Sequence, residues 1–454
     1  MLSTISEMFP TSLSSFLPSP TIIHIYLLIE LSFQIATLII CKTHMQPLSI
    51  APPHIMEPHL YVLKCLERLS RVTSNDKVKL EKFLSGWCRN SPFSSICRGN
   101  LLEFMTFAHY NKQVVDATSE ELSHVNDFLS FLATEHAIVP KAGYNPAVKA
   151  ARLSLESITF IPRPIIFYVI VHLMNSIKHV LLSVLGFRHL KCAATNTKYY
   201  HRYGTTAPRN NLPQPPMIFF PGISPAQTLF YLPLLFMGLL KKSSRELVIL
   251  ENKSVGMTLS LHAQTEESLV KTVGYIIERH FLEDITLLSH SLGSCPTTWV
   301  LRAFPDKIKA ALLLDPVTAY LSSPAVATAF VYPSKFTKLT EWIIFLAAST
   351  EPYIAWYLKR HFWWYRNELW VEDISKDIEI SIILSQDDEI VPSTEIYEGI
   401  NRQREWENLE HVTLQNVPGH HGFCIYAFWT WERLAESLAL MEKKGEMKRK
   451  SKGN

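Results

Sequence analysis

Three side chains in the C-terminal half of the chain could together perform acyl transfer: a serine, an aspartate and a histidine. Ser291 stands in the pentapeptide Ser289-His-Ser-Leu-Gly293, and Asp388 and His421 follow it in that order. A serine hydroxyl becomes an effective nucleophile when a histidine accepts its proton and a carboxylate orients that histidine. The residue types and their order therefore indicate chemistry through a serine nucleophile.

The turn that carries Ser291 is predicted from the segments on both sides of it. The apolar run 285–288 is typical of a buried strand, and residues 297–304 are compatible with a helix. Strand and helix nearly collide at such a turn, so small residues are needed two places before and after the nucleophile. Ser289 and Gly293 meet this requirement. The turn would lift the Ser291 hydroxyl out of the sheet.

Short apolar runs alternate with helical segments around this turn. Such runs are typical of strands in a parallel sheet that helices cover on both faces. Sheets of this kind place their active sites at the carboxyl ends of the strands. The predicted strands are 217–220, 247–250, 285–288, 310–314, 379–384 and 411–414.

The motifs within these segments resemble those of the α/β-hydrolase superfamily. The turn 289–293 is close to the family's G-x-S-x-G. Residues 385–392 (Ser-Gln-Asp-Asp-Glu-Ile-Val-Pro) are similar to its G-x-x-D-x-I/L-V-P, and 421–423 (His-Gly-Phe) are similar to its G-H-G/S-F/W. The resemblance covers roughly residues 216–440. It implies an α/β-hydrolase fold, in which helices lie on both faces of a mostly parallel sheet.

The resemblance also assigns the catalytic residues. The implied nucleophile, acid and base are Ser291, Asp388 and His421. Three neighbours remain alternatives to the acid and the base. Asp315 ends the fourth predicted strand and could be the acid, Asp387 adjoins the assigned acid, and His420 adjoins the assigned histidine.

Two backbone N–H groups stabilise the oxyanion in this family. The resemblance assigns them to Leu292, which follows the nucleophile, and to Ile223, in the loop after the first predicted strand. That loop carries Pro221-Gly222 where the family has His-Gly. Ser289 and Ser385 stand where the family usually has glycine. These departures keep open a hydrolase-fold protein that has lost catalysis.

Residues 1–45 are predicted to be a leader that contains a membrane anchor. The segment 21–41 is long and apolar enough to span a bilayer, although Glu30 near its middle would cost about 2.5–3.5 kcal/mol there. An interfacial or buried helix is the alternative. Positive charge begins after this segment, with Lys42, so the positive-inside rule predicts a membrane-associated protein whose catalytic domain faces the cytosol.

Residues 46–198 are predicted to be a helical accessory region, because their apolar residues recur with the period of a helix. The run 164–187 is apolar over most of its surface, which is typical of a helix that is buried or embedded in a membrane interface. His172 and His179 share one stripe of this run. No carboxylate accompanies them, so no metal site is predicted.

The remaining boundaries follow from composition. The polar segment 199–216 is predicted to be a linker, and 217–442 the hydrolase domain. Aromatic residues concentrate in the insertion 318–377, where the family has a lid over the nucleophile. A basic tail, 443–454, could contact an anionic surface.

Composition also limits the partners. The 44 Lys and Arg residues nearly balance 41 Asp and Glu residues, so nothing favours a nucleic-acid partner. The seven cysteines are scattered without a C-x-x-C pair, and no cofactor is predicted. The anchor, the interfacial helix and the aromatic lid together predict a membrane-associated serine hydrolase that cleaves carboxylic esters, with lipid acyl esters as substrates. The alternatives are a small-substrate esterase, thioesterase or peptidase, and a non-catalytic binding module at a membrane.

Overall fold

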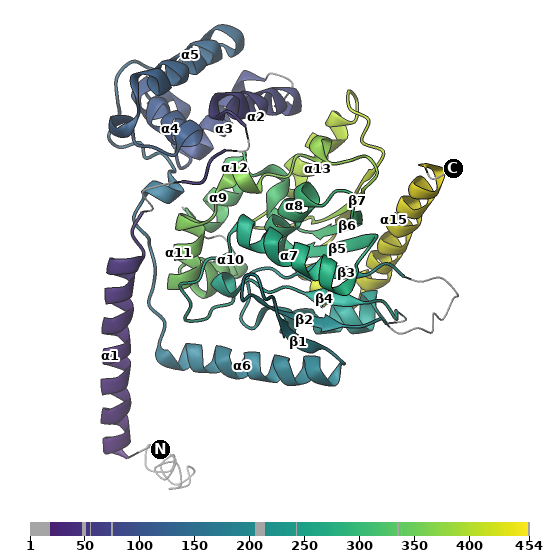
Figure 1. The fold of residues 1–454 in the computed structure, drawn as a ribbon. Coiled ribbons are helices and arrows are strands. Elements are labelled where there is room, and N and C mark those ends of the chain that lie inside the picture. The colour runs from purple at the N-terminus through teal and green to yellow at the C-terminus, as the bar shows by residue number, and fades with distance from the viewer. Residues whose placement is uncertain are drawn as a thin grey trace, which may run out of the picture.

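One eight-stranded sheet forms the centre of the computed structural model, with helices on both of its faces (Figure 1). The structure describes residues 19–47, 51–54, 56–73, 76–204, 214–241, 243–333, 336 and 338–452. The strands are β1 (Arg188–Lys191), β2 (Lys198–Arg202), β3 (Met217–Phe220), β4 (Leu247–Ile249), β5 (Ile285–His290), β6 (Ile308–Leu314), β7 (Glu379–Ser385) and β8 (Val412–Val417). All six predicted strands are present among them.

The sheet has the order β1-β2-β4-β3-β5-β6-β7-β8. From β4 to β8 every neighbouring pair is parallel, whereas β2 pairs antiparallel with both β1 and β4. The predicted mostly parallel sheet is therefore confirmed.

The predicted linker 199–216 is wrong in its first residues, because they belong to β2 and pair with β1 and β4. Both β1 and β2 are rich in Lys, Arg and His, so they lack the apolar run that reveals a central strand. The hairpin between them turns at Asn196, whose φ of +60° is tolerated better by Asn than by most residues. Residues 205–213 of the linker lie outside the described residues.

Successive side chains of each strand point to opposite faces of the sheet. They therefore pack into two separate apolar cores, one on each face. The covering helices are α7 (Glu266–His280), α8 (Ser294–Ala303), α13 (Ser393–Gln403), α14 (Phe423–Tyr426) and α15 (Trp431–Lys452). Ile218 and Phe220 of β3 pack in one core with α7, α8 and α13. Met217 and Phe219 pack in the other with α14 and α15. The strand ends that carry the candidate site are thus held from both sides.

The predicted tail 443–454 is not a separate segment, since α15 continues into it. Lys448 pairs with Glu379 at the start of β7, and Arg449 pairs with Asp284 just before β5. Two of the basic residues of the tail therefore form ion pairs at the sheet, whereas Lys450 pairs with Glu446 of its own helix. The last two residues of the tail lie outside the described part of the chain.

A helical insertion separates β6 from β7, in the interval where a lid is predicted. Its helices are α9 (Pro324–Phe330), α10 (Leu339–Ile344), α11 (Pro352–Arg360) and α12 (Trp364–Asn367). A second helical unit precedes the sheet. It contains α2 (Pro58–Thr73), α3 (Lys77–Trp87), α4 (Arg98–Tyr110) and α5 (Ser119–His136), and it has an apolar core distinct from the two sheet cores.

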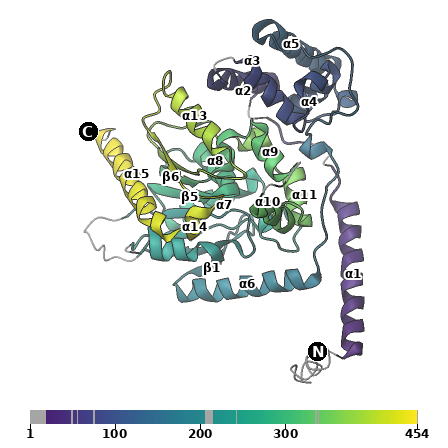
Figure 2. The ribbon, with the colours of Figure 1, turned by 180° about the vertical axis from the view of Figure 1, so that it is seen from behind.

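Two further helices, α1 (Pro20–His44) and α6 (Ile165–Val184), are long and apolar enough to cross a membrane. Figures 1 and 2 show α6 lying beneath the edge of the sheet, with α1 crossing its N-terminal end and continuing past it. At the crossing the Glu30 carboxylate accepts the Ile165 N–H at 2.9 Å, and Gln34 donates to the Arg163 carbonyl at 2.9 Å. Glu30 therefore caps the positive end of α6. Residues 1–18 of the predicted leader lie outside the described residues.

Candidate active site

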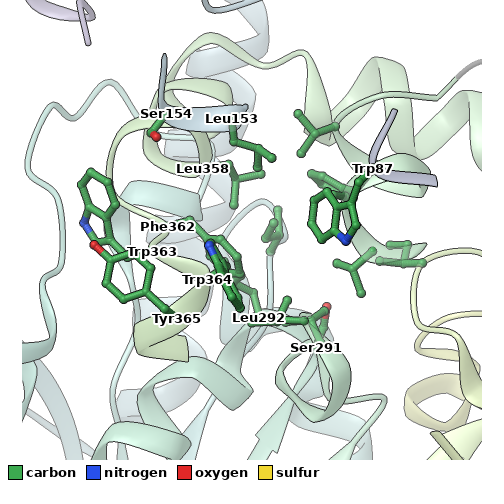
Figure 3. Close-up of a pocket in the computed structure, with 18 of the residues that line it drawn as sticks. Trp87, Leu153, Ser154, Ser291, Leu292, Leu358, Phe362, Trp363, Trp364 and Tyr365 are labelled. Atoms are coloured by element: carbon green, nitrogen blue, oxygen red, sulfur yellow. The ribbon is translucent and has the colours of Figure 1, made fainter. Parts of the chain in front are cut away.

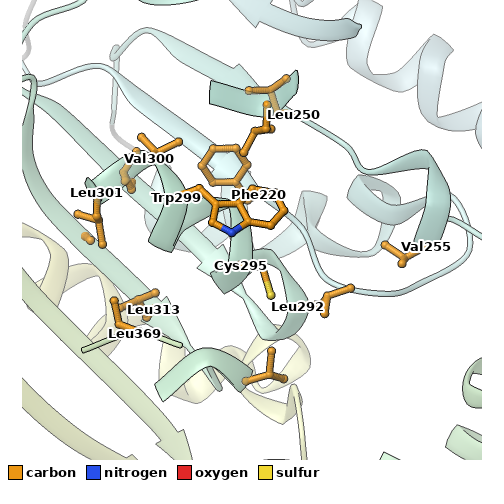
Figure 4. Close-up of a cluster of buried hydrophobic side chains, with 14 of the residues drawn as sticks. Phe220, Leu250, Val255, Leu292, Cys295, Trp299, Val300, Leu301, Leu313 and Leu369 are labelled. Atoms are coloured by element: carbon orange, nitrogen blue, oxygen red, sulfur yellow. The ribbon is translucent and has the colours of Figure 1, made fainter. Parts of the chain in front are cut away.

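Ser291 forms the turn between β5 and α8 in a strained conformation. Its φ of +52° lies in the left-handed region that serine rarely adopts. Gly293 is required because a Cβ there would lie 2.1 Å from the Phe220 carbonyl oxygen of β3. Behind the turn, Cys295 and Trp299 belong to the same buried cluster as Phe220 (Figure 4). Ser291 therefore lies in a sharp strand-to-helix turn, which has the geometry of a nucleophile elbow.

A hydrogen-bonded chain joins Ser291, His421 and Asp388. The Ser291 Oγ lies 2.8 Å from His421 Nε2, and His421 Nδ1 lies 2.7 Å from Asp388 Oδ2. The three residues follow β5, β8 and β7, whose carboxyl ends meet at one edge of the parallel sheet. The structure thus brings the three predicted residues together, with the Asp388 carboxylate fully buried.

The loop that follows β7 fixes the orientation of the Asp388 carboxylate. Oδ1 of Asp388 accepts hydrogen bonds from the backbone N–H groups of Ile390 and Val391, both at 2.8 Å. Aspartate readily forms turns of this kind with its own downstream backbone. Because Oδ1 is occupied, Oδ2 faces His421.

Asp315, the alternative acid, has different partners. It ends β6, is fully buried, and accepts the Ser385 N–H at 2.6 Å, the Ser385 hydroxyl at 2.8 Å and the Gly422 N–H at 2.9 Å. Ser385, which stands where the family usually has glycine, is therefore hydrogen-bonded to Asp315. Asp315 ties the end of β7 to the loop that carries His421.

The other two alternatives face away from Ser291. His420 Nδ1 lies 2.6 Å from Glu389 Oε1, and 47% of the His420 side chain is exposed. Asp387 is exposed, and its backbone N–H donates to the Gly419 carbonyl at 2.9 Å.

The charges around His421 favour its protonated form. Burial alone would lower the pKa of His421, but Asp388, Asp315 and Glu389 together raise the pKa above its ordinary value of 6.5. Burial also raises the pKa of the Asp315 carboxyl to about 6, against the effect of the nearby imidazole. Burial and the His421 charge hold the pKa of His290 well below its usual range. His290 is therefore neutral, whereas the pKa of His421 lies above its ordinary value.

The loop after β3 brings Ile223 beside Ser291. A Cβ on Gly222 would lie 3.0 Å from the Ser291 Cβ, so the loop approaches as closely as glycine permits. Ile223 and Leu292 both line the space above Ser291. Among the described residues, none accepts a backbone hydrogen bond from the Ile223 N–H. Both residues predicted to supply the oxyanion donors thus line the space into which Ser291 opens.

Tyr231 holds this loop against the elbow, and nothing in the sequence singles it out. Its hydroxyl lies 2.8 Å from His290 Nδ1 and accepts the Gly222 N–H at 3.0 Å. Because His290 is neutral, the hydroxyl can donate to it while accepting from the backbone. Only the folded chain brings Tyr231 to this position, so a single tyrosine nine residues after Gly222 carries no signal in the sequence.

Ser291 opens into an apolar cavity, and no charged residue of the described chain lies in its walls (Figure 3). The insertion contributes Phe330 and Phe362, as the predicted lid would. The helical unit before the sheet contributes Trp87 and Phe107. The sequence does not predict that the helical unit lines the cavity, because nothing in residues 46–198 connects them with the candidate catalytic residues.

Two groups of described residues bring three metal-ligating side chains close together. One is Asp315, Asp388 and His421, whose atoms already make the hydrogen bonds given above. The other is His201, Glu246 and His280. His201 Nε2 lies 2.5 Å from Glu246 Oε1, and His280 Nε2 lies 3.0 Å from the Tyr199 hydroxyl. These hydrogen bonds account for both groups without an ion.

No family model matches the sequence, and no curated protein matches it. The fold is similar to a carboxylesterase structure from the thaumarchaeon Nitrososphaera gargenis (14% identity, TM-score 0.37, covering 56% of this chain and 99% of that one). It is also similar to a bacterial membrane phospholipase A, with 12% identity, a TM-score of 0.41, and coverage of 62% of this chain and 94% of that one. A third similar structure is carboxylesterase CesB from Bacillus subtilis, with 11% identity, a TM-score of 0.37, and coverage of 60% of this chain and 96% of that one. These distant likenesses concern the fold alone. The chain has the α/β-hydrolase fold, confirming its sequence-based prediction, with an eight-stranded mostly parallel sheet, helices on both faces and a helical region before the sheet.

Proposed function

We propose that the chain is a membrane-associated serine hydrolase that cleaves carboxylic esters of lipids. The observation that carries this proposal is the hydrogen-bonded chain from Asp388 through His421 to Ser291, at the floor of an uncharged cavity. A serine in a strained elbow, with a histidine within 3 Å and a buried carboxylate behind it, has the geometry of an activated nucleophile.

In the proposed reaction the Ser291 Oγ attacks the carbonyl carbon of the ester while His421 Nε2 takes the hydroxyl proton. Asp388 orients the ring and stabilises the imidazolium. The N–H groups of Leu292 and Ile223 hold the oxyanion, where removal of one donor typically costs about 2.7–4 kcal/mol. His421 then returns the proton to the departing alkoxide, and the alcohol leaves. A water molecule, activated by the same ring, hydrolyses the acyl-enzyme.

The cavity walls favour an apolar acyl group as substrate. Their described residues offer no charged side chain to a charged substrate, and two of the polar side chains, Asn111 and Ser154, hydrogen-bond to each other. Burial of apolar surface contributes about 25 cal/mol per Å², so a hydrocarbon chain would bind there by desolvation. This favours lipid esters over peptides or small polar esters.

Two exposed apolar surfaces support the membrane association. One face of α6 packs on the protein, and the opposite face exposes Ile166, Val169, Ile170, Leu173, Ile177, Val180, Leu181 and Val184. The first ten residues of α1, 20–29, extend past α6, and large side chains there are exposed on all sides. At 1.5 Å per residue they reach about 15 Å, half of a hydrocarbon core of about 30 Å. With Glu30 fixed on α6, this arrangement favours insertion into one leaflet. The cytosolic orientation stays a prediction.

The test is labelling by a fluorophosphonate probe in detergent. Wild-type protein should be labelled, and Ser291→Ala and His421→Ala should not. Ser289→Ala is the matched control, because the Ser289 hydroxyl is buried without a partner and its loss should leave labelling intact. A folded wild type that stays unlabelled, in detergent and on vesicles, would contradict the proposal and favour the binding module. Glycerolipid esters are the first substrates to assay on a labelled protein.

A further inference from the structure

The helical unit α2–α5 contains an apolar cavity of its own. All four helices line it, with Leu66 of α2, Leu84 of α3, Met105 of α4 and Phe128 of α5 among the walls. None of the described residues that line it is charged. Protein interiors are normally packed without voids much larger than a water molecule, and apolar voids stay dry. A space of this kind is therefore suited to an apolar ligand.

This cavity adjoins the one above Ser291. Trp87, Phe107 and Trp364 line both. They come from α3, α4 and the start of α12, so the shared wall is also the contact between the helical unit and the insertion. Figure 3 shows Trp87 and Trp364 on facing sides of the space that leads away from Ser291. Three side chains thus separate the candidate nucleophile from the interior of the helical unit.

The helical unit is held in a definite position over the insertion. The Trp87 indole N–H donates to the Ser322 carbonyl at 3.1 Å, and the ring stacks on Phe104 at 5.1 Å. Next to it, Gly86 lies so close to Pro324 that a Cβ would come within 2.4 Å of the proline ring. The alignment of the two cavities therefore follows from specific contacts between the helical unit and the insertion.

We propose that the α2–α5 unit binds the distal part of a long, unbranched acyl chain whose carbonyl carbon is attacked by Ser291. The carboxyl end lies in the first cavity, and the methyl end passes Trp87, Phe107 and Trp364 into the second. This inference rests on the proposed function and adds the substrate class, long-chain acyl esters. Each methylene buried in the second cavity would strengthen binding by about fourfold. A short acyl group would end before the shared wall.

The direct test uses the wild-type full chain and an alkyl fluorophosphonate as long as a palmitoyl chain, with a photoreactive diazirine near its methyl end. After reaction and irradiation, peptide mapping should find the phosphonyl group on Ser291 and the cross-link on peptides of α2–α5. Reaction at Ser291 with cross-links on the surface or the insertion alone would overturn this inference and leave the proposed function standing. No reaction at Ser291 would overturn both.

A variant with a matched control tests the same inference through turnover. Ala108→Phe places an aromatic ring in the second cavity, and Ala133→Phe places one on α5 outside the walls of that cavity. Ala108→Phe should lower kcat/KM for p-nitrophenyl palmitate by at least about tenfold and leave p-nitrophenyl butyrate unchanged. Ala133→Phe should change neither. Equal losses on both esters in a folded Ala108→Phe protein would contradict the inference. If this variant does not fold, the cross-linking result decides.

Discussion

Replacing Asp388 with asparagine tests the proposed base most sharply, because the structure fixes which way the new amide must point. Oδ1 of Asp388 accepts two backbone N–H groups, from Ile390 and Val391. An amide nitrogen cannot accept them, so the amide oxygen stays there and the NH₂ group faces His421 Nδ1. That nitrogen must then accept a hydrogen bond, which moves the proton of the neutral ring to Nε2. His421 would present a proton to Ser291 instead of a lone pair.

The expected loss follows from this reversed tautomer. A comparable asparagine substitution in a serine protease triad lowers kcat by about 10⁴-fold, which corresponds to about 5.4 kcal/mol of barrier. The same loss is expected here, measured as kcat on p-nitrophenyl butyrate in detergent. The melting temperature should change little, because the shape of the side chain and the contacts of its oxygen are retained.

Asp387→Asn is the matched control, since Asp387 is exposed and adjoins Asp388 without contacting His421. It should retain full activity. A loss smaller than about tenfold in a folded Asp388→Asn protein would refute the tautomer argument. A full loss in Asp315→Asn, with Asp388→Asn active, would assign the acid to the end of β6.

Two further predictions concern pH and the membrane. The acid limb of kcat/KM should have a midpoint above pH 6.5, because only neutral His421 accepts the serine proton and its pKa is raised. Asp315→Asn removes one charge that raises this pKa, so the midpoint should move to lower pH; an unshifted profile would contradict the electrostatic account. Ile23→Asp combined with Leu27→Asp should reduce the fraction of protein that floats with phospholipid vesicles, whereas Val115→Asp, at an even more exposed site beside α4, should not. Unchanged flotation of the double variant would argue against insertion of α1.

The central strands could be predicted from the sequence because burial on both faces leaves a mark in composition. In β5 and β6 every residue is buried, so each reads as a short apolar run. The edge hairpin β1–β2 could not be recognised in this way, since its strands carry Lys, Arg and His. The helical unit α2–α5 shows its period in the sequence, but its place beside the cavity depends on contacts such as Gly86 with Pro324, which are distant in the chain.

The candidate site also combines features that the sequence predicts with features that only the folded chain reveals. The sequence by itself determined the fold class, the elbow around Ser291, and the order of the three residues proposed to be catalytic, because a turn has local steric requirements that a few residues express. It left Asp315, Asp387 and His420 open as alternatives. Only the tertiary structure decided which carboxylate and which imidazole reach Ser291, since a hydrogen bond of 2.7 or 2.8 Å depends on how three separate loops pack at one edge of the sheet. It alone revealed Tyr231 and the two adjoining cavities, because both arise where segments far apart in the sequence meet.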